Sequence, residues 1–138
     1  MPPANRPFGV TLLLWLVLSL SAWGATRVAA AFRWWDVLLE YDSRLSPAYL
    51  AVTGVIWAIA GIALCWSMIR REESARLRLV SAAGVWQAQF WVERVFFQSE
   101  RANLPFALTT SAAMLLIIVV ITFHRSTIYY FSKSEDHE

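Results

Sequence analysis

The sequence predicts an all-α integral membrane protein whose four transmembrane helices form one bundle. Hydrophobic residues make up 58 % of the 138 residues and charged residues only 16 %, whereas soluble proteins contain about 45–50 % and 25 %. The apolar residues gather in four long stretches, and a domain of this size could not bury so much apolar surface away from water. We therefore expect a single membrane domain that covers residues 1–138.

The first apolar stretch, residues 7–26, contains no charge between Arg6 and Arg27. Its length matches the roughly 20 residues with which a helix crosses the hydrocarbon layer. A secretory signal peptide is the alternative, because the small residues 28–30 would serve as a cleavage site. We interpret the stretch as the first membrane helix.

The connection that follows predicts a short amphipathic helix over residues 28–44. Its polar residues recur at spacings of three or four and so mark one narrow face of a helix: Arg33, Asp36, Glu40 and Arg44. Opposite charges three or four residues apart support one another on a helix. The adjacent Trp34 and Trp35 predict that this helix lies at the membrane surface or against a partner.

Two further spans have clear start signals. Ser46 and Pro47 are typical of the N-cap and first position of a helix, and the apolar residues then continue over 47–69 until two arginines follow. Asn103 and Pro105 give the same signal for a span over 105–123. Residues 132–138 form a short polar tail. These two spans complete the apolar part of the predicted bundle together with residues 7–26.

Residues 79–97 have the length of a span but contain charged and amide side chains. A charge at the centre of a membrane helix costs about 2.5–3.5 kcal/mol on an insertion scale. We expect neighbouring helices to shield this third span. The alternative is an amphipathic helix in the membrane interface, which would leave three spans and place the two termini on opposite sides.

Small residues predict how the second and third spans pack. They recur along one face of the second span: Ala51, Gly54, Ala58, Gly61 and Cys65. The third span repeats the rhythm with Ser81, Gly84 and Ala88. Small residues let helix backbones approach closely in membranes. We expect these two faces to pack against each other within one chain, and the alternative is that they join copies of the chain.

The polar residues of the third span form the candidate polar or partner-contact site. They are Trp86, Gln89, Glu93 and Arg94. A carboxylate inside a membrane is by default a candidate for proton or cation coupling. The alternative is that Glu93 and Arg94 reach the headgroups from the helix end. The helical register places Glu93 opposite Gly84, so we expect it to point away from the second span and to face the first helix, the fourth helix or a partner.

The sequence contains no motif of known catalytic or metal-binding chemistry. Its single cysteine cannot form an internal disulfide or a multi-thiolate metal site. The twelve Lys and Arg residues are scattered and nearly balanced by ten Asp and Glu residues, which gives no surface for nucleic acid. We expect no enzymatic activity, no cofactor and no metal.

These observations favour a small, non-catalytic, multi-pass subunit that packs within a larger membrane complex and stabilises it, for example in electron transfer or transport. The alternative is a small oligomeric proton-coupled transporter that uses Glu93, and a sensory or assembly role is a third possibility. Expected partners are the lipid bilayer and other membrane subunits or further copies of the chain. A slight excess of Lys and Arg on one side predicts cytoplasmic termini.

Overall fold

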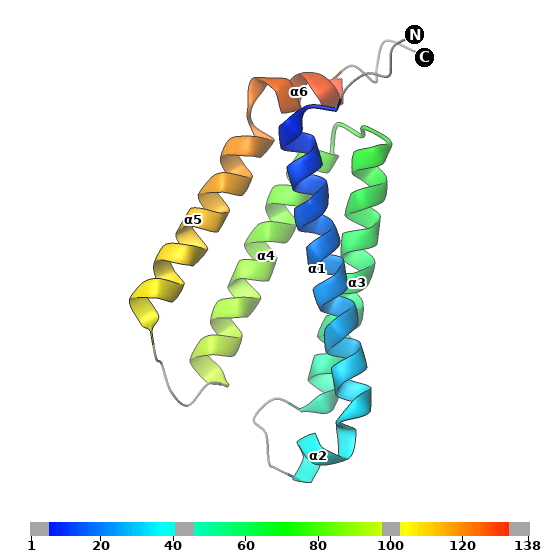
Figure 1. Ribbon diagram of the computed structural model, residues 1–138, viewed down its shortest axis with the longest axis vertical. Helices are drawn as coiled ribbons and strands as arrows, with labels where there is room; N and C mark the ends of the chain where they lie inside the picture. The colour runs from blue at the N-terminus through cyan, green and yellow to red at the C-terminus, as the bar shows by residue number, and fades with distance from the viewer. Residues whose placement is uncertain (1–5, 41–45, 98–102, 133–138) are drawn as a thin grey trace.

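The computed structural model describes residues 6–40, 46–97 and 103–132. Every regular element in these ranges is an α-helix: α1 (Phe8–Arg33), α2 (Trp35–Glu40), α3 (Pro47–Ile69), α4 (Ala75–Phe96), α5 (Leu104–Thr122) and α6 (Arg125–Ser132). The four long helices lie side by side, with α2 and α6 at opposite ends (Figure 1). Helices α1, α3 and α5 are long and apolar enough to cross a membrane. The predicted all-helical fold is thus confirmed for the described residues, and these three helices are consistent with a membrane protein. The predicted bundle of four membrane spans is not confirmed, because α4 is not among the three.

Helix α3 begins and ends where the sequence predicts. The backbone N–H of Tyr49 donates a hydrogen bond of 3.1 Å to the Ser46 side chain, which satisfies one of the free donors of the first turn. At the other end Arg71 adopts a left-handed φ of 58°, and the chain reverses into α4. Asn103 differs from its prediction, because its φ is also left-handed and its side chain makes no capping hydrogen bond.

The predicted boundary between the first span and the surface helix is wrong. Helix α1 continues through Arg27 to Arg33, because residues 28–32 are apolar and rich in alanine and contain no residue that ends a helix. The chain bends at Trp34, so within the predicted helix over 28–44 residues 28–33 belong to α1 and residues 35–40 form α2, whereas residues 41–44 lie outside the described part of the chain. Arg33 and Asp36 therefore belong to different helices and form no ion pair with each other. Arg44 lies outside the described residues.

The small face of α3 packs against α1, so its predicted packing against α4 is also wrong. A Cβ atom added to Gly24 of α1 would lie 2.6 Å from the Ala58 nitrogen and 2.7 Å from the Gly54 oxygen. A Cβ atom added to Gly61 of α3 would lie 2.7 Å from the Cβ atom of Ser21 on α1. The Ser21 hydroxyl donates a hydrogen bond of 3.1 Å to the Ala58 carbonyl. The two backbones meet because small residues occupy both faces.

The small residues of α4 do not take part in this contact. Ser81, Gly84 and Ala88 are exposed, and a Cβ atom on Gly84 would meet nothing within 4 Å. Of the small residues predicted on α3, Ala51 and Cys65 are half-buried. Helix α4 therefore turns another face, which carries polar side chains, toward the rest of the protein.

Helix α6 is an element that the sequence reasoning missed. It lies across the end of the bundle where α1 begins (Figure 1), and it buries Thr127, Tyr130 and Phe131. The Arg71 guanidinium lies 4.5 Å from the centre of the Tyr130 ring, which is within the range of a cation–π interaction. This contact joins α6 to the turn between α3 and α4.

Candidate functional site

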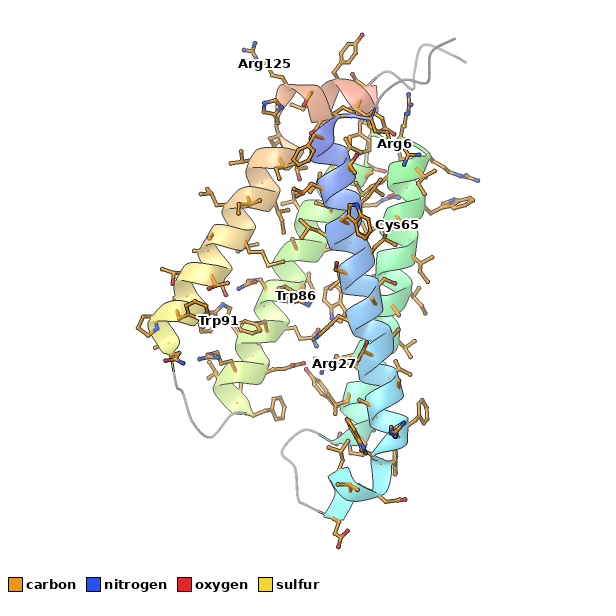
Figure 2. The ribbon with its side chains drawn as sticks, in the orientation of Figure 1. Arg6, Arg27, Cys65, Trp86, Trp91 and Arg125 are labelled. Atoms are coloured by element: carbon orange, nitrogen blue, oxygen red, sulfur yellow. The ribbon has the colours of Figure 1, made fainter. Side chains whose placement is uncertain are left out.

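The polar cluster, which we define as Arg27, Tyr49, Trp57, Gln89 and Glu93, joins three helices. Arg27 extends from α1 toward the lower end of α4 (Figure 2). Its two terminal nitrogens donate hydrogen bonds of 3.0 and 2.9 Å to the two carboxylate oxygens of Glu93. This paired geometry is the strongest form of an arginine–carboxylate contact. The side chains are only 10 % and 17 % exposed, so the ion pair lies largely inside the protein.

Further donors complete the environment of Glu93. The Tyr49 hydroxyl on α3 donates to Glu93 Oε1 at 3.1 Å, and the Gln89 amide donates to the same oxygen at 2.8 Å. The indole N–H of Trp57, which is buried in α3, donates in turn to the Gln89 carbonyl oxygen. The cluster is therefore a continuous hydrogen-bonded chain that crosses from α3 to α4.

Aromatic rings surround the cation. The Arg27 guanidinium lies 4.6 Å from the centre of the Trp23 ring and 6.0 Å from that of the Tyr49 ring. Both contacts are attractive, because the face of an aromatic ring carries negative charge. The positive charge of Arg27 is thus balanced by Glu93 and by two ring faces.

The predicted set of polar residues on α4 divides into two groups. Gln89 and Glu93 belong to the polar cluster. Trp86 packs edge-on against Trp23 of α1, with ring centres 6.1 Å apart, and Arg94 lies beside a hollow between α4 and α5. The expectation that Glu93 faces the first helix agrees with its contact to Arg27, but the expectation that it turns away from the second span is wrong.

The sequence reasoning missed Arg27, Tyr49 and Trp57. In the sequence, Arg27 is the charge that marks the predicted end of the first span. A usable signal did exist, since alternating spans place the end of the first and the end of the third on the same side. The opposite charges of Arg27 and Glu93 then come to the same depth.

The predicted interfacial residues lie at the far end of α1 and in α2. Trp34 and Trp35 are 53 % and 37 % exposed, and Trp35 stacks on Phe32 with ring centres 6.4 Å apart. No residue of α2 is buried. Asp36 and Glu40 are exposed on the same short helix. This end of the molecule therefore presents aromatic and acidic side chains together.

Comparisons with protein-family models, with curated protein sequences and with solved structures find no match for the chain.

Proposed function

We propose that the protein is a non-catalytic integral-membrane subunit that packs within a larger membrane complex and stabilises it. The observation that carries the proposal is the engagement of Glu93, the carboxylate that a transport mechanism would need. Its oxygens accept hydrogen bonds from Arg27, Tyr49 and Gln89. A carboxylate held in this way is suited to fixing α1, α3 and α4 against one another.

In this proposal α4 also crosses the membrane, as the third of four spans. Its charged and amide side chains make it less apolar than the other long helices, but the ion pair between Glu93 and Arg27 removes much of the cost of a lone charge in lipid. Four crossings also agree with the position of α6 beside the start of α1. The Lys and Arg distribution favours the cytoplasm for that end.

The aromatic end of α1 and α2 is the surface that we assign to a partner subunit. It exposes Phe32, Trp34 and Trp35 beside the exposed Leu39. Tryptophan is enriched where protein surfaces meet, and a helix that buries nothing in its own chain is free to bury its apolar side chains in another. The acidic Asp36 on the same helix would face a basic or hydrogen-bonding group at the rim.

The proposal is tested by extracting the tagged, full-length protein in a mild detergent. Blue-native electrophoresis and mass spectrometry then give its size and the chains that migrate with it. We expect unrelated membrane subunits to migrate with the wild type and to be lost from the W34A/W35A double variant. The W15A variant is the matched control, because Trp15 is 68 % exposed on the first half of α1, away from the aromatic end. Migration as a single chain or only as copies of itself would overturn the proposal.

A proton-coupled transporter is the second candidate. The observation that favours it is the hydrogen-bonded chain from Tyr49 through Glu93 to Gln89, because buried carboxylates in such chains carry protons in pumps and transporters. In vesicles with a trapped pH-sensitive dye, this function requires proton flux that E93Q abolishes. E72Q is the control, since Glu72 pairs with Arg78 at the α3–α4 turn. Absence of flux in the wild type would exclude the transporter.

A further inference from the structure

A hollow of about 230 Å³ lies among the helices, separate from the polar cluster. Its walls come from α1, α3, α4 and α5 and are mostly aliphatic, as at Leu13, Leu79 and Ile118. A second hollow of about 250 Å³ continues between α4 and α5. Both are lined by Trp86, Gln87 and Met114, so the two hollows adjoin at this point. We call them together the α4–α5 groove.

Gln87 brings an unused hydrogen-bond donor to the junction. The residue is only 7 % exposed, and its Nε2 atom has no hydrogen-bond partner within the described part of the chain. The hydroxyls of Ser19 and Thr110, which also line the groove, already donate to carbonyls of their own helices. A buried amide nitrogen without an acceptor is costly, so a ligand that supplies an acceptor oxygen would be favoured at Gln87.

Aromatic rings flank this donor. Trp86 packs on Trp23 in the first hollow and stacks on Phe90 toward the second, with ring centres 6.2 Å apart in the latter pair. Rings prefer to pack on other rings in offset or edge-on arrangements. A flat ring that carries a carbonyl oxygen fits the aromatic walls near Gln87, and an aliphatic chain attached to that ring fits the mostly aliphatic walls of the first hollow.

We infer that the α4–α5 groove binds an apolar, carbonyl-bearing ring of the quinone class, with the carbonyl oxygen accepting from Gln87. The inference does not require the subunit role proposed above, but its argument from depth rests on the membrane crossing of α4 that belongs to that proposal. It places no redox step in the protein.

The depth of Gln87 distinguishes this ligand from a membrane phospholipid. Gln87 lies nine residues before the end of α4 at Phe96, which corresponds to roughly 14 Å along a helix. With α4 across the membrane, that position is near the centre of a hydrocarbon core about 30 Å thick. The ester carbonyls of a phospholipid remain near the surface, and its acyl tails contain no acceptor.

The first test uses the full-length wild-type protein in phosphatidylcholine nanodiscs. The discs are incubated with decylubiquinone, repurified through a tag on the protein, and extracted to measure the retained quinone. We expect near-stoichiometric retention above that of empty discs. Decylbenzene has a ring and the same tail but no carbonyl, and it should not compete. Retention equal to that of empty discs, or full competition by decylbenzene, would overturn the inference.

Variants then locate the site. Q87L introduces an apolar side chain of similar volume and removes the donor, and it should weaken quinone binding about tenfold, as the loss of one hydrogen bond predicts. A83L should block binding, because Ala83 lines the first hollow. A88L is the matched control on the exposed face of α4 and should bind as the wild type does. Equal binding by Q87L, A83L and the wild type would place the quinone elsewhere and refute the site.

Discussion

Replacing Gly24 with alanine should weaken the packing of α1 against α3. The new Cβ atom would lie 2.6 Å from the Ala58 nitrogen, 2.7 Å from the Gly54 oxygen and 3.1 Å from the Trp57 carbonyl carbon. These are backbone atoms, which no side-chain rotation can move, so the two helices must separate by nearly an ångström. Overpacking of this kind costs about 1–3 kcal/mol. Two contacts under 3.0 Å with backbone atoms place this variant in the upper part of that range, at about 2–3 kcal/mol. Alanine recovers about 1 kcal/mol in helix propensity, so we expect a net loss of about 1–2 kcal/mol.

The matched control is Gly84→Ala on α4. There a Cβ atom meets nothing within 4 Å, so only the gain in helix propensity remains and the variant should be more stable than the wild type. Reversible unfolding in mixed detergent micelles with rising SDS measures both free energies. The reasoning is refuted if G24A is as stable as the wild type, or if both variants change stability in the same direction.

Three further predictions concern side chains. R27A and E93A should each lower the free energy of unfolding by about 3–5 kcal/mol, because each leaves a buried charge unpaired. The double variant R27M/E93M should lower it much less. Additive losses in the same SDS titration would contradict the pairing. W57F should cost about 1–3 kcal/mol by leaving the Gln89 oxygen without its donor, and unchanged stability would show that this bond contributes nothing. S46A should cost about 1 kcal/mol and increase fraying at the start of α3, which amide hydrogen exchange of Tyr49 would reveal.

The helix boundaries that could be predicted are those with a physical stop signal. Helix α3 begins at Pro47, directly after Ser46, and ends at Ile69, directly before Arg70, and both ends match the prediction. The end of α1 could not be predicted in this way, because Arg27 resembles a boundary charge in the sequence. The Arg27 charge is paired with Glu93 on α4, so α1 can continue beyond Arg27. Pairing of helices was equally undetermined, since small residues mark faces on α1, α3 and α4 alike.

The residues of the candidate site also divide into those that the sequence reveals and those that only the packed helices reveal. Gln89 and Glu93 were visible because polar residues stand out in an apolar stretch. Tyr49 and Trp57 were not, because aromatic residues are common in membrane helices and their polar atoms become significant only through a partner. Gln87 lies on the same helix and differs from Gln89 in sequence only by its position. Its unpaired donor is a property of the packed helices.

The ion pair between α1 and α4 also constrains how the protein enters the membrane during synthesis. Arg27 leaves the ribosome 66 positions before Glu93, so α1 and α3 are made before the counter-charge exists. Until α4 arrives, the lone arginine keeps the lower part of α1 near the water boundary, where its long side chain can reach the headgroups. In the proposed four-span arrangement, insertion of α4 then draws both charges inward together. The insertion of the third span is therefore the step that sets the final depth of the first helix.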